Sequence, residues 1–251
     1  MLGAGMLAMA QIDFVVAKSV LASAEAMHRE LGDLTPTGIC QFSLGVVAQD
    51  DGDPVAATAH VEEAIATFRV AADDDWVRAT LNNLGLVVAR AGDLDRGEAL
   101  LNEALARHRD AGFAQGSRTA LRFLGQVELM RGDMERAGVL FRESLDDGWE
   151  HTDKWHVVGA LEGVAAVAAL RKQPEVAAHL LGASEAIRER VGVPVEPAKR
   201  AEYEGIVSTI RSALGDAAHA RARQAGRALT AEQAVDLALG TEQAASDAPL
   251  P

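Results

Sequence analysis

The sequence has 251 residues, of which 49% are apolar, 4% aromatic and 24% charged, a balance typical of folded proteins and not of low-complexity chains. With 24 Lys and Arg against 37 Asp and Glu, the net charge is −13, which disfavours binding to the phosphate backbone of nucleic acids. The scarcity of aromatic residues favours closely packed helices over a β-sandwich. The single cysteine, Cys40, excludes an internal disulfide, so a reducing cytoplasm is the expected compartment.

The first expected element is a helical hairpin over residues 1–31. Its start, MLGAGMLAMAQIDF, is apolar but has neither the basic residues of a signal peptide nor the ~20 apolar residues of a membrane span. We expect a buried helix that is cut at Met1, so that the chain is a fragment or begins late. Because a terminal repeat needs a polar outer face, this truncated N-terminal repeat is predicted to fray or to mediate self-association.

Residues 36 to 192 repeat with a period of forty, and the hairpin at 1–31 follows the same template. The columns read Leu44, Leu84, Leu124 and Val164; Gly45, Gly85, Gly125 and Ala165; Gly52-Asp53, Gly92-Asp93 and Gly132-Asp133; Ala57, Gly97, Ala137 and Ala177; Val61, Leu101, Phe141 and Leu181; and Ala64, Ala104, Ser144 and Ser184. With two helices in each period, the pattern predicts hairpins at 36–72, 75–112, 115–148 and 154–192.

Small residues in these columns predict where two antiparallel helices approach closely. The Gly of each Gly-Asp pair suits the left-handed conformation after a helix end, and the Asp suits the cap of the next helix. Gly85 and Gly125 are expected to face the second helix of their own hairpin, near Gly97 or Ala137. A leucine at Gly125 should be costly, whereas an alanine is expected to be near neutral because alanine is the better helix former.

After a loop that holds Pro194 and Pro197, three further helices are expected. The first, about 198–214, has an apolar stripe that should close the open end of the stack. The stripe consists of Tyr203, Ile206, Val207, Ile210 and Leu214. The second covers 216–228, and Thr230 with Gln233 forms a capping box that begins the third, which ends at Leu239.

The columns resemble the tetratricopeptide repeat, whose pattern carries Leu-Gly, Gly-Asp, Ala, an aromatic residue or Leu, and Ala. The long period and the stretch from 177 to 240 resemble the helical arm of actinobacterial signal-transduction ATPases and LuxR-type regulators. That family's ATPase and helix-turn-helix modules would lie outside this chain. His219 and Arg223 stand where the family commonly has an aromatic residue, so looser packing of the last helices is expected.

Together, the periodicity and this resemblance predict an all-α fold, a tetratricopeptide-like right-handed superhelix of hairpins. Helical repeats are expected in residues 1–192, capping helices in 193–240 and a disordered tail in 241–251.

The motifs with catalytic residue types are better explained by the repeat. The segment GDLDRGEA, residues 92–99, has the glycine spacing of a phosphate-binding loop, but Glu98 and Ala99 replace the Lys and the Ser or Thr that contact phosphate and Mg²⁺. His151, Asp153 and His156 are metal-ligand types, but their spacing matches no zinc motif, and a loop between hairpins is the preferred interpretation. No catalysis, metal or cofactor is therefore expected.

The first helices of the central hairpins carry the best candidates for ligand recognition. The candidates are Asn82, Asn83, Arg90, Arg118, Arg122 and Gln126. Arg118 and Arg122 are four residues apart, so both guanidinium groups can project from one helix face toward a carboxylate. A solvated helix face without a ligand is the alternative interpretation.

These observations favour a non-catalytic scaffold that binds a protein, a peptide or a small effector in a groove. The resemblance implies that such a scaffold is the regulatory arm of a bacterial ATPase or transcriptional regulator. An accessory subunit that completes a catalytic partner and a degenerate remnant are the alternatives. Direct nucleic-acid binding and membrane insertion are not expected.

Overall fold

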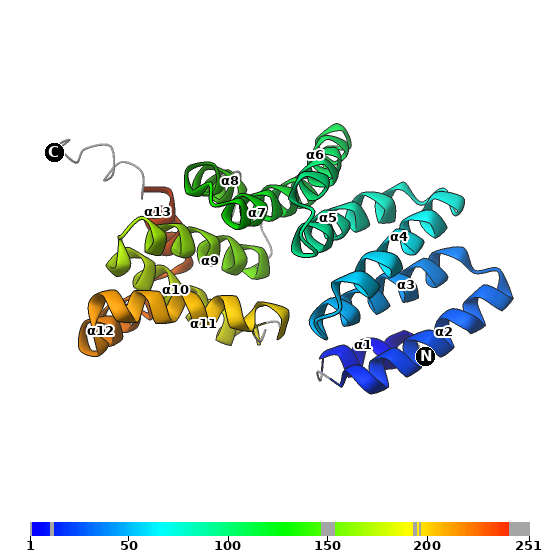
Figure 1. Ribbon diagram of the computed structural model, residues 1–251, viewed down its shortest axis with the longest axis horizontal. Coiled ribbons are helices and arrows are strands. Elements are labelled where there is room, and N and C mark those ends of the chain that lie inside the picture. Colours follow the sequence, from blue (N-terminus) through cyan, green and yellow to red (C-terminus); the bar gives the residue numbers. More distant parts are fainter. Residues whose placement is uncertain (1, 11–12, 147–153, 193–194, 196, 241–251) are drawn as a thin grey trace. The chain divides into compact units, whose positions relative to one another are not determined.

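The computed structural model describes residues 2–10, 13–146, 154–192, 195 and 197–240. These residues form thirteen α-helices and, within those ranges, no strand (Figure 1). The all-α prediction is therefore confirmed. The predicted tail, 241–251, and the segment with His151 and Asp153 lie outside the described residues.

Ten of the helices form five consecutive pairs. They are α1 (Leu2–Ala10) with α2 (Phe14–Leu31), α3 (Leu34–Asp50) with α4 (Pro54–Val70), α5 (Asp74–Arg90) with α6 (Leu94–Asp110), α7 (Ala114–Arg131) with α8 (Met134–Asp146), and α9 (Lys154–Leu170) with α10 (Pro174–Val191). Three more helices follow, namely α11 (Pro197–Leu214), α12 (Asp216–Arg227) and α13 (Ala231–Gly240). The helices begin and end within a few residues of the predicted hairpins.

The turns recur at half the sequence period. A residue with positive φ stands at every twentieth position from 32 to 132 and again at 172 and 192. These residues are Gly32, Gly52, Ala72, Gly92, Gly112, Gly132, Lys172 and Gly192. The turn within a hairpin and the turn between hairpins therefore use the same left-handed residue, and glycine relieves the steric cost at six of the eight positions.

Aspartates cap the helices that follow several of these turns, as the Gly-Asp column predicts. The side chains of Asp53, Asp93 and Asp133 accept hydrogen bonds from the backbone N–H three residues later, at 2.9, 3.1 and 2.9 Å. Each cap provides a partner for one of the N–H groups that the first helical turn leaves unpaired.

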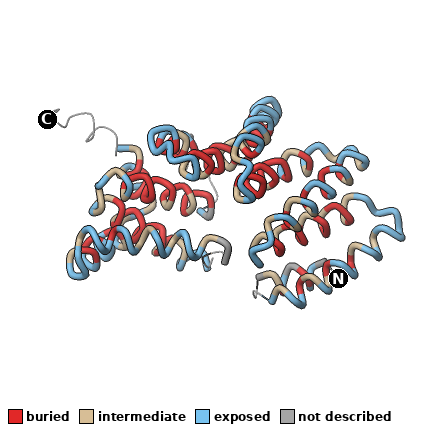
Figure 2. Tube along the Cα trace, in the orientation of Figure 1, coloured by how far each residue is buried: buried red, intermediate tan, exposed pale blue. Residues whose placement is uncertain are grey.

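The chain divides into two compact units, unit 1 (Met1–Ala120) and unit 2 (Leu121–Pro251), and the division falls within α7. In unit 1 the largest cluster of buried side chains lies between α4 and α5, around Phe68 and Leu81. Buried residues concentrate on the helix faces that meet one another (Figure 2). The predicted boundary between repeats and capping helices, near residue 192, does not coincide with the division between the two units, and it stays a prediction.

The core of unit 2 combines repeat helices with all three C-terminal helices. Phe141, Leu161 and Leu180 form one buried cluster with Ile210 of α11 and Val235 of α13, and α13 packs against α8, α9 and α10. The predicted stripe of α11 does bury its apolar residues, since Tyr203 and Ile206, among others, pack against this cluster.

Helices α10 and α12 cross at two glycines. A Cβ atom at Gly182 would lie 2.1 Å from the carbonyl oxygen of Arg223, and one at Gly226 would lie 2.0 Å from that of His179. His219 is buried, and Arg223 forms an ion pair with Glu185. The expectation of looser packing at these helices is therefore wrong, because backbone contact at the two glycines takes the place of an aromatic anchor.

The small-residue column lies where the repeat predicts it. A Cβ atom at Gly85 would lie 2.6 Å from Leu101 and 3.0 Å from the carbonyl oxygen of Gly97. One at Gly125 would lie 2.9 Å from the ring of Phe141, and a Cβ at Gly163 would lie 2.4 Å from the same ring. Because this ring lies between two glycines and has little room to move, the expectation that alanine at Gly125 is near neutral does not hold.

Candidate ligand groove

Asn82, the first predicted groove residue, lies inside unit 1. Its side chain is buried, and its Nδ2 donates to the carbonyl oxygen of Gly116 (3.2 Å) and lies 3.1 Å from Nε2 of His108. Gly116 has no side chain to displace the imidazole, since a Cβ there would lie 2.3 Å from it. Asn82 therefore joins α5 to α6 and to the start of α7.

The imidazole of His108 is suited to accept this hydrogen bond. Burial lowers the pKa of His108, and the nearby charge of Arg78 lowers it further. The ring is then neutral near pH 7 and can accept a hydrogen bond from the amide N–H through Nε2. The Asn82–His108 pair is a buried structural contact and offers a ligand no accessible amide.

Three further predicted groove residues lie on the helices of unit 1. The side chain of Asn83 donates to the carbonyl oxygen of Ala79 in its own helix, at 3.1 Å. Arg90 lies at the end of α5 and Arg118 in the first part of α7, and both are partly buried. The geometry neither confirms nor excludes a ligand at these three residues, so their role stays a prediction.

Arg122, the next candidate, is buried in unit 2, with a relative exposure of 2%. Its side chain crosses α9 at Gly159, where a Cβ would lie 3.2 Å from Cδ and Nη1 of the arginine. Glu162 lies one turn further along α9 than Gly159, and the positive charge of Arg122 lowers the pKa of its carboxyl group. Arg122 thus lies among buried groups, and a glycine on the neighbouring helix provides the space for it.

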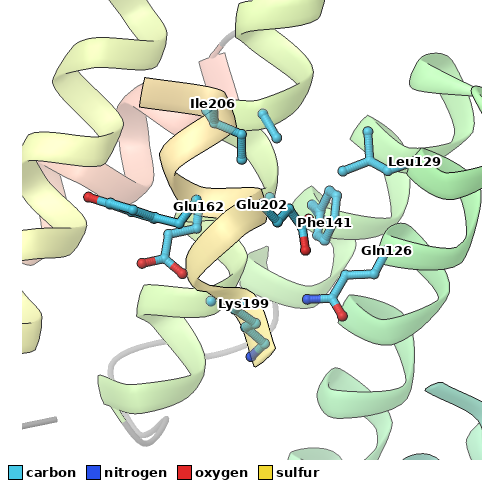
Figure 3. A pocket seen from close by; sticks show the side chains of 11 residues that line it. Gln126, Leu129, Phe141, Glu162, Lys199, Glu202 and Ile206 are labelled. Atoms are coloured by element: carbon cyan, nitrogen blue, oxygen red, sulfur yellow. The ribbon is translucent and has the colours of Figure 1, made fainter. Parts of the chain in front are cut away.

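Gln126 lines a groove of unit 2 that is formed by α7, α9 and α11 (Figure 3). The groove consists of two adjoining hollows that share Gln126, Leu129, Ala166, Glu202 and Ile206. One hollow has a volume of ≈ 440 Å³ and continues along Met130, Ala169 and Leu170. Met130 and Leu170 are 41% and 52% exposed, so this end of the groove presents apolar side chains to solvent.

The other end of the groove is polar. Glu162 and Lys199 line it, and Gln126 and Glu202 lie where the two hollows adjoin (Figure 3). The Glu202 carboxylate makes no ion pair within the described residues. Burial raises the pKa of Glu162, and the positive charges of Arg188, Lys199 and Arg122 oppose that rise. Arg188 lies 2.5 Å from the Glu162 carboxylate. One partly buried carboxylate thus lies among three cationic side chains at this end.

Helix α11, which supplies one wall of the groove, is held by hydrogen bonds from Tyr203. Its hydroxyl donates to Glu185 of α10, and the same carboxylate lies 2.7 Å from Nε of Arg223 in α12. Burial and the hydrogen bond to Glu185 raise the pKa of Tyr203, so the hydroxyl keeps its proton and remains a donor. This link holds α11, which carries Lys199, Glu202 and Ile206, to α10.

The groove includes three residues of α11 that the sequence analysis assigned to no site. Lys199, Glu202 and Ile206 follow i, i+3 and i+7 spacing and so share a helix face. That spacing was the one indication in the sequence that the three residues lie together, but the sequence does not show which helix their shared face contacts.

Within the described ranges, no three His, Cys, Asp or Glu side chains are grouped in a way that could hold a metal ion. Nor is any described helix both long and apolar enough to cross a bilayer.

Comparisons with known proteins agree with the repeat. The family model of the tetratricopeptide repeat matches residues 76–147, from α5 to the end of α8. None of the curated proteins matches this sequence. Among solved structures, BtubC (BKLC) from P. vanneervenii is similar over 93% of each chain, with 16% identity and a TM-score of 0.57.

A second solved structure, the Rap conjugation gene regulator of the plasmid pLS20 in complex with the Phr* peptide, is similar over 97% of this chain and 73% of that one. Its TM-score is 0.62 and its sequence identity 15%. At these identities both structures show a shared fold alone, a stack of tetratricopeptide-like helical hairpins.

Proposed function

We propose that this protein is a non-catalytic scaffold that binds a segment of a protein or peptide partner in the groove formed by α7, α9 and α11. The observation that carries the proposal is the groove itself, with apolar side chains at one end, Glu162 and Lys199 at the other, and Glu202 between them. Apolar residues of a partner would bury Met130 and Leu170, and polar groups at the other end would fix its orientation.

The similarity to known folds supports this proposal. Stacks of helical hairpins present extended surfaces for recognition, and one structure with this fold holds a peptide. The sequence also resembles the helical arm of bacterial regulatory ATPases and LuxR-type regulators. On that basis we propose that the scaffold is part of a regulatory assembly in the cytoplasm. Of the six residues proposed at the sequence level, Gln126 is the one that lines this groove.

Peptide display against the full-length chain tests the proposal. Peptides selected on the wild type are measured by fluorescence anisotropy against the Met130→Glu/Leu170→Glu double variant. We expect at least about tenfold weaker binding, because two charges replace apolar contacts. Val139→Glu is the matched control, since Val139 is 49% exposed on α8 and lines neither hollow. Equal binding to the double variant and to the wild type would contradict the proposal.

A further inference from the structure

Unit 1 has a cavity of its own, between the start of α5 and the turn that joins α6 to α7. Its volume is ≈ 450 Å³, within the roughly 300–1,000 Å³ of pockets that hold small ligands. Its lining consists of Asp75, Trp76, Arg78, Ala79, Ala111 and Phe113. None of these residues lines the groove of unit 2, so the cavity is a separate candidate site.

Both aromatic side chains of the cavity are held from behind by other rings. Trp76 stacks on Phe68, with ring centroids 5.3 Å apart and planes inclined by 13°, and the centroid of Phe42 lies 6.3 Å from that of Trp76. Phe113 packs at 5.6 Å against the buried ring of His108. An occupant would therefore meet two aromatic surfaces that are already ordered, which lowers the entropic cost of binding.

The two charged residues of the lining neutralise each other. Arg78 forms an ion pair with Asp75, and the Arg78 side chain is only 19% exposed, so it belongs to the wall of the cavity. A cationic occupant would be repelled by Arg78, and an anionic one by Asp75. Either would also exchange its hydration water for alanine and aromatic side chains, a cost that no unpaired charge of the lining offsets. The lining therefore favours a neutral occupant.

Three planar groups of the lining favour an aromatic occupant among the neutral ones. They are the indole of Trp76, the phenyl ring of Phe113 and the guanidinium of Arg78. An aromatic ring gains more from contact with such groups than the burial of its area provides, whereas a saturated side chain gains the burial alone. Phe113 is 47% exposed, so an occupant that covers it also removes apolar surface from water.

We propose that this aromatic cavity binds the neutral aromatic side chain of a phenylalanine, tyrosine or tryptophan presented by a partner protein or peptide. The incoming ring contacts Trp76 and Phe113 and leaves the Asp75–Arg78 ion pair intact. The cavity is then a second anchor for a partner, in addition to the groove of unit 2, and the proposal does not depend on what that groove binds.

The test compares three blocked hexapeptides: Gly-Ser-Gly-Phe-Gly-Ser and the same peptide with cyclohexylalanine or with arginine in place of phenylalanine. Cyclohexylalanine is apolar and of similar size but has no aromatic ring. Binding to the full-length, ¹⁵N-labelled chain is followed by NMR at the indole N–H of Trp76, which is assigned by its loss in Trp76→Phe. We expect a saturable shift with the phenylalanine peptide and about fivefold or more weaker binding of the other two.

Variants of the lining locate the binding site. Ala79→Glu places a charge in the wall at an exposed position of α5 and should weaken binding of the phenylalanine peptide at least about tenfold. Phe113→Leu keeps an apolar side chain without the ring and should weaken it about fivefold. Ala22→Glu is the matched control, since Ala22 is exposed on α2 and does not line the cavity. The Met130→Glu/Leu170→Glu variant of the groove should bind this peptide as the wild type does.

Four outcomes would overturn the proposal. They are the absence of a shift at Trp76, binding of the cyclohexylalanine or arginine peptide as tight as that of the phenylalanine peptide, unchanged binding by Ala79→Glu, and a loss of binding in the groove variant. The last outcome would place the peptide in the groove, so the two sites are tested independently.

Discussion

The two units follow one repeat template, but the polar side chains on the first helices of their hairpins have different surroundings. In unit 1, Asn82 of α5 lies against His108 and Gly116, so its amide is used within the fold. In unit 2, Glu162 of α9 is next to α11, and the adjoining side chains leave a groove. The difference shows that the template determines the hairpins, while the helix that packs next to each face determines whether a surface is open.

The largest effect is expected at the crossing of α10 and α12, where the backbone lies closer to a glycine Cβ position than it does at the crossing of Gly85 and Gly97 in unit 1. Gly182→Ala would place a Cβ 2.1 Å from a backbone oxygen that cannot move aside as a side chain can. We expect the free energy of unfolding in urea to fall by about 3 kcal/mol. Gly205→Ala on α11 is the control, because nothing lies within 4 Å of its Cβ position, and it should be neutral or stabilising. Equal effects would mean that the helices are not in backbone contact.

A neighbouring pair of asparagines tests the internal use of polar groups in unit 1. Asn82→Ala removes a buried donor and leaves the Gly116 carbonyl and the His108 nitrogen without it, so a loss of about 1–3 kcal/mol in unfolding free energy is expected. Asn83→Ala removes only a hydrogen bond within its own helix and should change stability by less than about 0.5 kcal/mol. If the two variants proved equally stable, Asn82 would not be the structural contact described here.

The partly buried carboxylate of Glu162 in unit 2 should make the stability of the protein depend on pH in a distinctive way. Because burial raises the pKa of Glu162 in the folded state, the folded chain keeps a proton that the unfolded chain loses above about pH 4.3. The stability due to this group is complete below that pH and is lost as the pH rises through the folded pKa. Glu162→Gln cannot titrate, so the wild type should lose stability relative to this variant as the pH rises from about 4.3 through the raised pKa of the folded state. Parallel stability curves in urea titrations would contradict this cause.

The smallest effect is expected at two turns that have a residue other than glycine at the left-handed position, one in each unit within the described ranges. Ala72 and Lys172 adopt φ of 54° and 61°, where other turns of the series have glycine. Ala72→Gly and Lys172→Gly should each stabilise by about 0.5–1 kcal/mol, because removal of the Cβ relieves strain and more than offsets the added entropy of the unfolded chain. Gly92→Ala makes the reverse change and should destabilise. Thermal unfolding resolves both signs, and a common sign for all three variants would count against the strain.

The sequence predicted the hairpins well because each depends on local signals. Gly92 and Asp93, for example, end one helix and cap the next, and Gly85 lies where a side chain has no room. The second series of turns was not recognised, because its glycines, Gly32, Gly112 and Gly192, are twice the repeat period apart and Ala72 takes the position between the first two. Local chemistry was therefore sufficient for the repeat and for most helix ends.

The candidate site was less predictable because it depends on contacts between distant residues. Asn82 is an ordinary helix-surface residue by its position, and only His108, in the next helix, makes it a buried one. Arg122 was expected to face a ligand, and Gly159 of α9 accommodates it inside unit 2 instead. The wall formed by Lys199 and Ile206 could not be placed, since the direction in which α11 packs follows from tertiary contacts.

The packing of α13 against α8, α9 and α10 has a consequence for how the chain acquires its structure during synthesis. A stack whose contacts join only neighbouring helices can form progressively as the ribosome releases them, because each contact spans a short stretch of chain. Unit 2 cannot be completed in this way, because α8 is made well before α13 and the contact between them waits until α13 has emerged. Until then the apolar surface that will receive Val235 and Ala238 is open, and this interval is when a chaperone or a second nascent chain has access to it.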